Sequence, residues 1–442
     1  ACFTWDYNYG TSVAYVKKSD ITKIFSGSGV SADTTAPAIT GVSGTRTATS
    51  TGKVAYTSSE SGALYYKVVE KGASAPSINS IVNGSPVRAG SNSFTVSGLS
   101  GTAKDVYFVV RDSSGNISAR MKATLEAFDA VDALPDRLSG ALRTDTAVQI
   151  SKAMFANDAA NNIVLVDGLN YPDALAAVSF AHRINAPILL CFGKQGRVDE
   201  GTQNEIKRLD KDHDANIYII GGTDAITSNV DKTLKGLGYA DTKIQRIQGN
   251  TRYSTAIELA KKQTGVKRVY LVPGVNYPDA LSAGSAAAAN DGVILFSEAK
   301  QMNAETSAYL KSAGISEVVI VGGESAVPKQ VENDVRAIVP NVTRISGANR
   351  VETSVNVAKT YFPTTKVVFV ATGLDFADAL SGGPLAVSFD APLLLVNNNK
   401  PNENAAVLNY IKTCGAKKVV VLGGTNAVST QMQTLLNNAI SR

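Results

Sequence analysis

The stretch Gly168-Leu-Asn-Tyr-Pro-Asp-Ala-Leu175 decides the fold of most of this chain, because it occurs three times. It returns as Gly274-Val-Asn-Tyr-Pro-Asp-Ala-Leu281 and, in altered form, as Gly373-Leu-Asp-Phe-Ala-Asp-Ala-Leu380. Two further landmarks recur in the same order: a glycine followed by an arginine and a threonine at fixed distances, and a Gly-Gly doublet after an apolar run. The first set is Gly140/Arg143/Thr146, Gly249/Arg252/Thr255 and Gly347/Arg350/Thr353, and the doublets are Gly221-Gly222, Gly322-Gly323 and Gly423-Gly424. The chain therefore contains an internal repeat of about 100 residues.

Each copy alternates short apolar runs with stretches of helical spacing. In the first copy, Ala147, Ile150 and Met154 recur at helical spacing, whereas 163–166 and 188–190 are continuous apolar runs. Continuous apolar strands separated by helices are typical of a parallel sheet covered on both faces. We therefore predict three tandem α/β repeats, at residues 138–242, 243–341 and 342–442.

The N-terminal part has a different rhythm. Short β-branched and aromatic runs at 53–56, 64–69, 93–96 and 105–110 alternate with clusters of Gly, Ser and Asn. This pattern predicts a small β-sandwich of the immunoglobulin or fibronectin type III kind over residues 33–130. Residues 1–32, which hold the only tryptophan, Trp5, are left as an unassigned segment.

Composition narrows the classes of function. The net charge is +5, with 12 basic and 9 acidic residues before residue 131 and 31 against 29 after it. Such a balanced surface argues against nucleic-acid binding by bulk charge. No apolar stretch is long enough to span a bilayer, so no membrane insertion is expected. Three cysteines and two histidines exclude a disulfide framework and argue against a metal site, and no cofactor is indicated.

The three landmarks together resemble the cell-wall-binding repeat type 2 family of clostridial surface and S-layer proteins, over residues 138–442. The resemblance implies Rossmann-like or Toprim-like units around a pseudo-threefold axis. It also implies non-covalent binding to an anionic, phosphate-containing wall polysaccharide. The family's segment linked to wall binding matches Ile188, Leu189 and Leu190 after Pro187, and Leu393, Leu394 and Leu395 after Pro392. We interpret these runs as buried central strands with a structural role; the second copy, Gly292-Val-Ile-Leu-Phe296, departs from the pattern.

Among the repeated polar residues, Arg143, Arg252 and Arg350 are the candidate polysaccharide-binding residues. Each is expected at the start of a helix, where unpaired N–H groups favour anions, and a guanidinium fork suits phosphate. The alternative is that each arginine pairs with the aspartate of its own repeat. That aspartate (Asp173, Asp279 or Asp378) is expected in a first helical turn, where it favours the helix dipole. No His, Cys or second acid repeats beside it, so no catalytic residue is assigned.

The sequence thus predicts a secreted surface protein of the cell wall or S-layer, held by three repeats and without enzymatic activity in this chain. Other surface proteins are further candidate partners. One alternative is the anchor of a wall hydrolase whose catalytic domain lies upstream of residue 1. Another is a repeat protein that binds small phosphorylated ligands at the strand ends.

Overall fold

A computed structural model describes residues 2–5, 12–15, 33–48, 51–77, 85–99, 102–127 and 129–440. The chain forms two compact units, Ala1–Ala130 and Val131–Arg442. In the segment that the sequence leaves unassigned, strands β1 (Cys2–Trp5) and β2 (Ser12–Tyr15) pair antiparallel. The rest of residues 1–32 lies outside the described residues.

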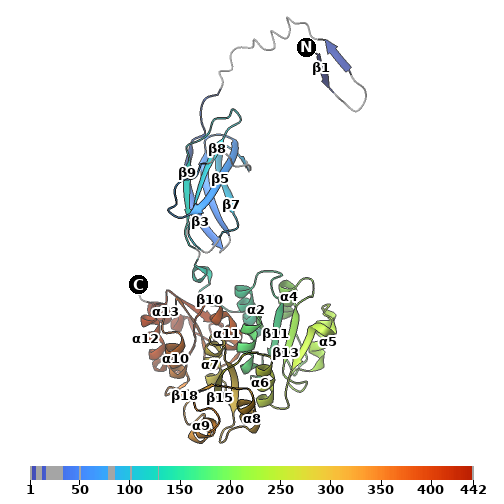
Figure 1. Cartoon of the computed structure of the whole chain (residues 1–442), viewed down its shortest axis with the longest axis vertical. Coiled ribbons are helices and arrows are strands. Elements are labelled where there is room, and N and C mark those ends of the chain that lie inside the picture. The colour runs from blue at the N-terminus through green and yellow to red at the C-terminus, as the bar shows by residue number, and fades with distance from the viewer. Residues whose placement is uncertain are drawn as a thin grey trace. The chain divides into compact units, whose positions relative to one another are not determined.

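The predicted β-sandwich is confirmed (Figure 1). Its strands are β3 (Ile39–Ala48), β4 (Thr51–Ser58), β5 (Gly62–Glu70), β6 (Ser85–Val87), β7 (Gly90–Val96), β8 (Lys104–Arg111) and β9 (Met121–Leu125). They form two antiparallel sheets in the orders β3-β4-β7 and β6-β5-β8-β9. Along β4, alternate residues are buried, so that Val54 and Tyr56 pack with Phe108 and Leu125 in one core.

The C-terminal unit contains the three predicted α/β repeats, each with a four-stranded parallel sheet. The sheet orders are β12-β11-β13-β14, β16-β15-β17-β18 and β20-β19-β21-β10. The strands are β10 (Arg137–Leu138), β11 (Asn162–Asp167), β12 (Ile188–Cys191), β13 (Asn216–Ile220), β14 (Ile244–Ile247), β15 (Arg268–Pro273), β16 (Val293–Ser297), β17 (Glu317–Val321), β18 (Val342–Ile345), β19 (Val367–Thr372), β20 (Leu393–Val396) and β21 (Lys418–Leu422).

The sheets are linked by strand exchange between repeats. Strand β14 ends the first sheet, yet the chain continues from it into the first helix of the second repeat, and β18 does the same one repeat later. Strand β10, which precedes the first repeat, pairs with β21 of the third. The same backbone bond recurs each time: the first glycine of the doublet donates to the exchanged strand, at 2.9 Å from Gly423 to Leu138. The three repeats therefore close into a ring.

The helices cover both faces of the sheets. They are α2 (Arg143–Met154), α3 (Ala177–Arg183), α4 (Glu200–Leu209), α5 (Ser228–Gly236), α6 (Arg252–Lys261), α7 (Pro278–Ala289), α8 (Ala304–Ser312), α9 (Lys329–Arg336), α10 (Arg350–Tyr361), α11 (Ala377–Ser388), α12 (Ala405–Thr413) and α13 (Thr430–Asn438). Short 3-10 turns are η1 (Ala130–Ala133), η2 (Ala174–Ala176), η3 (Asp241–Lys243) and η4 (Pro401–Asn404).

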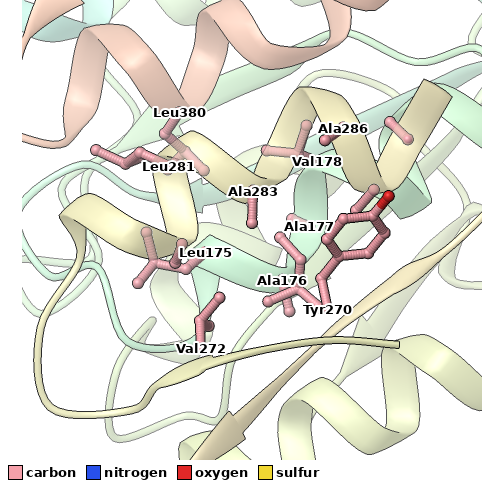
Figure 2. Close-up of a cluster of buried hydrophobic side chains, with 14 of the residues drawn as sticks. Leu175, Ala176, Ala177, Val178, Tyr270, Val272, Leu281, Ala283, Ala286 and Leu380 are labelled. Atoms are coloured by element: carbon pink, nitrogen blue, oxygen red, sulfur yellow. The ribbon is translucent and has the colours of Figure 1, made fainter. Parts of the chain in front are cut away.

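The equivalent helices α3, α7 and α11 contact one another pairwise in the middle of the unit. Figure 2 shows this core, where Val178 of α3 lies beside Ala283 of α7, and Leu380 of α11 lies beside Leu281. Small residues allow the close approach, since a Cβ atom on Gly383 would lie 2.6 Å from Cγ1 of Val178. One hydrophobic cluster runs through all three repeats, so they share a core.

The apolar runs at 188–190 and 393–395 are buried strands, but they are not central. Strands β12 and β20 each stand at one end of their sheet, and β11 and β13, or β19 and β21, lie in the middle. Helices α2 and α11 contact β12, and α10, α7 and α11 contact β20, which explains why these end strands are fully apolar. None of the described helices is both long and apolar enough to cross a membrane.

Candidate functional site at the seams between repeats

The Gly-Arg-Thr landmark forms the turn into the first helix of each repeat. Helices α2, α6 and α10 begin at Arg143, Arg252 and Arg350, as predicted. In each turn the glycine N–H donates to the hydroxyl of the threonine six residues on, at 3.1 Å. A Cβ on this glycine would overlap the side chain at the third helical position, so only glycine fits.

N-cap side chains of the protein cap the starts of α6 and α10, whereas no N-cap side chain caps the start of α2. The backbone N–H of Leu142 donates to the Asp145 carboxylate, that of Thr251 to Ser254 Oγ, and that of Ala348 to the Glu352 carboxylate. At α6 and α10 the cap side chains, Thr251 and Asn349, also accept backbone N–H groups. The capped starts of α6 and α10 therefore offer fewer unpaired N–H groups to an anion than expected, whereas at α2 the expectation stays a prediction.

Each arginine instead folds back onto the loop that begins the Asp-Ala-Leu stretch of its own repeat. Nη1 donates to the carbonyl oxygens of Gly168, Gly274 and Gly373, at 2.7, 2.6 and 2.5 Å. These loops follow β11, β15 and β19, so the guanidinium groups lie at the carboxyl ends of the parallel strands. Open parallel sheets commonly bind ligands at this edge.

The aspartates of the second landmark pack under the Gly-Gly doublets. Gly221, Gly322 and Gly423 have positive φ angles of 123°, 128° and 101°. A Cβ on any of them would press on Oδ2 of Asp173, Asp279 or Asp378, respectively. Asp279 and Asp378 lie in first helical turns as expected, whereas Asp173 directly precedes η2.

Each aspartate faces the arginine or threonine of the following repeat, and the third faces the first. Asp173 accepts a hydrogen bond from Thr255, and the positive charge of Arg252 acts on it. The charge of Arg350 acts on Asp279 in the same way. Asp378 accepts a hydrogen bond from Thr146 of the first repeat, and the charge of Arg143 acts on it. The expected alternative, a pair within one repeat, is therefore wrong: the partner belongs to a neighbouring repeat. We call these three contacts seam 1/2, seam 2/3 and seam 3/1.

Burial dominates the electrostatics of the seams. Desolvation raises the pKa of Asp173, and it raises the pKa of Asp279 and of Asp378 to about 6. For Asp378 the charge of Asp375 adds to this effect. Arg350 and Arg143 oppose the shift without cancelling it. These carboxylates are therefore held where ionisation is costly.

Three aromatic rings meet beside the seams, one from each repeat. Tyr171, Tyr277 and Phe376 occupy the same position in the repeated stretch, and their ring centroids are 5.3 to 6.2 Å apart. Arg143 lies over the ring of Phe376 and Arg350 over that of Tyr277, each again from the following repeat. The aromatic cluster thus marks the pseudo-threefold axis and packs against the arginines.

A cleft of about 510 Å³ opens at seam 3/1. It is lined by Gly140–Arg143 and Thr146 of the first repeat and by Thr372, Leu374, Asp375, Ala377, Asp378 and Gly424–Ala427 of the third. Within it Nη2 of Arg143 lies 3.2 Å from Oδ2 of Asp375. The volume is in the range of small-ligand sites.

Three segments of the chain, residues 137–231, 246–332 and 344–433, match the family described as cell wall binding domain 2 (CWB2). Together they make up more than half of the sequence. The chain belongs to the CWB2 family. Its C-terminal unit is therefore a cell-wall-binding unit, and the recognition made from the three landmarks is confirmed.

Similar proteins agree with this assignment. N-acetylmuramoyl-L-alanine amidase LytC of Bacillus subtilis is 33% identical over 304 residues, and the amidase enhancer of the same species is 28% identical. Each alignment covers 69% of this chain, but only 58% and 40% of the two relatives. The solved structure of Cwp8 from Clostridium difficile, 26% identical, matches 77% of this chain and 60% of Cwp8 with a TM-score of 0.61. Cwp6 from the same organism shares the fold at 20% identity, with a TM-score of 0.65 over 91% of this chain and 68% of Cwp6.

The two apolar runs for which the sequence resemblance implies a link to wall binding lie inside the protein. Ile188, Leu189 and Leu190 are at most 1% exposed, and Leu393, Leu394 and Leu395 at most 2%. Side chains buried to this degree make no contact with a polymer outside the folded unit.

Sequence reasoning missed a second series of arginines. Arg137, Arg246 and Arg344 precede the first series by six residues. Their Nη1 atoms donate to the carbonyl oxygens of the first glycines of the doublets, at 2.5 to 2.8 Å. Each thereby holds an exchanged strand to the sheet it completes. The regular spacing before the glycine turn is the signal that could have revealed them.

Outside the CWB2 repeats, one acidic trio stands out among the described residues. Single carboxylate oxygens of Asp33, Glu60 and Asp112 lie within 4.8 Å of one another in the β-sandwich. Asp112 already accepts hydrogen bonds from the backbone and side chain of Asn116.

Proposed function

We propose that the C-terminal unit anchors a secreted surface protein non-covalently to the bacterial cell wall or S-layer by binding an anionic, phosphate-containing polysaccharide. Arg143, Arg252 and Arg350 are the proposed polysaccharide-binding residues, one at each seam. The β-sandwich would then serve as a spacer or interaction module. No catalytic step is assigned to this chain.

The observation that carries the proposal is the threefold recurrence of one guanidinium at the carboxyl ends of the strands in a wall-binding family. A guanidinium offers five N–H donors, and only Nη1 is used by the glycine carbonyl in each repeat. The side chain of Arg143 is 31% exposed, so a ligand can reach it. A polymer with repeating phosphates would engage several such sites, and weak contacts would multiply through effective concentration.

The first prediction concerns the three arginines together. Full-length chain is sedimented with purified cell walls, before and after removal of the anionic polymer. We expect single Gln substitutions at Arg143, Arg252 or Arg350 to weaken binding and the triple variant to abolish it. Binding is also expected to fall as salt rises, because each contact is charge-assisted.

The control is Arg183→Gln. Arg183 also bridges two repeats, to the carbonyl oxygen of Thr264 and to Asp291, but at the amino ends of the strands. The Arg183→Gln variant is expected to bind cell walls as the original chain does. A triple variant with a lower melting temperature but unchanged affinity when folded would remove the three arginines from the site. Equal binding to walls stripped of the polymer would refute the proposed ligand.

The likeness to an amidase favours a second candidate: the CWB2 repeats of this chain anchor a wall hydrolase. Reading the coding sequence upstream of Ala1 tests it, and a sequence with no hydrolase domain there would exclude it.

A further inference from the structure

The three seams are not equivalent, because the residue before the aromatic ring differs. The first and second repeats have Asn170 and Asn276 there, and the third has Asp375. Asn276 and Asp375 adopt the same local geometry, since the Oδ1 atom of each accepts the backbone N–H of the next residue. The third repeat alone therefore places a carboxylate at this position, 3.2 Å from the arginine of its neighbour.

The doublet turns differ as well. After Gly-Gly, the first repeat has exposed Thr223 and Asp224, and the second has exposed Glu324 and Ser325. In the third repeat the same positions are Thr425 and Asn426, both exposed and neutral. The turn that lines the cleft at seam 3/1 thus offers a hydroxyl and an amide, which hydrogen-bond sugar hydroxyl and phosphate groups without repelling them.

The corresponding space in the first repeat is smaller and more acidic. It measures about 250 Å³, and its lining includes the carboxylates of Asp167, Asp173 and Asp224 with only Lys194 as a cation. At seam 2/3 the charge of Arg350 also acts on Glu403 of its own repeat, and the adjoining turn carries Glu324. The first place thus has three carboxylates to one cation, against two carboxylates, Asp375 and Asp378, to Arg143 at seam 3/1, so a phosphate meets less repulsion at seam 3/1. At seam 2/3 it would meet a competing carboxylate.

Resting on the proposed function, we infer that the cleft at seam 3/1 is the principal sugar-phosphate site, and that Asp375 is a built-in competitor that the phosphate displaces from Arg143.

The Arg143–Asp375 pair is suited to such an exchange. Both side chains are partly exposed, at 31% and 46%, and solvent-screened ion pairs of this kind contribute little to stability. A phosphate diester that reaches Arg143 replaces one anion by another, while Thr146, Thr372, Thr425 and Asn426 line the same cleft for the sugar. Leu142 and Leu374, 51% and 41% exposed, form apolar walls. A ligand must offset the free energy of the Arg143–Asp375 ion pair that it displaces, and a weakly bound carboxylate would not do so. The competitor therefore favours phosphate.

The test uses full-length chain and the soluble phosphate-containing polysaccharide extracted from purified cell walls, titrated by calorimetry. Asp375→Asn copies the residue of the other two repeats, so it retains the local turn. It is expected to raise affinity by up to about fivefold, because Arg143 loses its competitor. Arg143→Gln is expected to lower affinity at least about tenfold, and Arg350→Gln about twofold. Polymer from which phosphate has been removed is the ligand control, and Arg183→Gln is the protein control.

The outcomes separate the two proposals. If the unmodified chain does not bind the polymer, the proposed function fails. If it binds, but Asp375→Asn leaves affinity unchanged or lowers it, or Arg350→Gln costs as much as Arg143→Gln, the inference about seam 3/1 fails and the proposed function stands. Melting temperatures of all variants identify any loss of binding that comes from unfolding.

Discussion

The charge state of the aspartates under the glycine doublets affects the stability of the ring. Burial raises the pKa of Asp279 and of Asp378 from 3.8 to about 6, so the folded chain binds these protons more tightly than the unfolded chain does. Their protonation therefore stabilises the folded state. This contribution is fully present below about pH 4 and is lost as the pH rises through about 6. Glu332 has the opposite sign, since its pKa is lowered to about 2: the stability it contributes is present above about pH 4.5 and is lost as the pH falls through about 2.

We accordingly predict that the double variant Asp279→Asn/Asp378→Asn loses the pH dependence that these groups impose. Between pH 5 and 7 the unfolding free energy of the original chain is expected to fall by roughly 1 kcal/mol for each of the two carboxylates. The asparagine oxygen can still accept the Thr146 hydrogen bond, so the variant is expected to be more stable than the original chain at pH 7. Denaturant unfolding at the two pH values measures this. An equally steep fall in the variant would assign the pH dependence to other groups.

At the level of single residues, the sequence predicts positions better than partners. The spacing of Arg143 after Gly140 predicts a helix start, and the helix does start there. The spacing does not say which repeat lies beside which, so it suggested a pair with Asp173 where the structure has Asp375. The caps at Asp145 and Glu352 were also missed, since Ser254 takes their place in the second copy and hides the pattern.

Among the elements, strands β12 and β20 show how much an apolar run reveals. A continuous run predicts burial on both faces, and Leu394 is indeed fully buried. Its place in the sheet depends on the order of crossovers, which hydropathy does not encode. Strand β10 was missed for another reason: two residues are too few to produce a pattern.

The position of these strands yields a prediction about the family segment linked to wall binding. Leu394→Ala is expected to lower the unfolding free energy by roughly 2–5 kcal/mol, because it leaves a cavity in a packed core. Well below the melting temperature, the folded protein is expected to bind cell walls as the original chain does. Leu435→Ala, at a leucine of α13 that is 42% exposed, is the matched control and is expected to change neither quantity. If the folded Leu394→Ala variant lost affinity for cell walls although the cavity is its only structural change, Leu394 would be in direct contact with the wall polymer.

On the scale of the whole molecule, the three repeats form one ring rather than independent domains. Helices α3, α7 and α11 cover one another, and β10 joins the third sheet to the start of the first repeat. The repeat number and the α/β class could be deduced from the landmarks alone. The pseudo-threefold arrangement came only from the family resemblance, since a tandem repeat is equally compatible with an open array.

Closure predicts that two repeats are not enough. A chain that ends at residue 341 loses α11, exposing apolar faces of α3 and α7, and leaves β10 without its partner. We expect it to aggregate, or to melt without a cooperative transition, in gel filtration and calorimetry. A soluble monomer of two repeats with a sharp transition that still binds walls would show that the repeats act independently.

Strand β10 also determines how the anchor bears load. Any pull on residues 33–130 enters the C-terminal unit through the segment that leads to Arg137. That segment reaches the third sheet through a two-residue strand and the bonds from Arg137 to Gly423, Val428 and Gln433. Together with the ion pairs Asp132–Lys417 and Asp136–Lys418, these bonds apply the tension first where residues 132–138 meet the third repeat, next to seam 3/1. The affinity for the wall and the mechanical stability of the anchor would then depend on the same few residues.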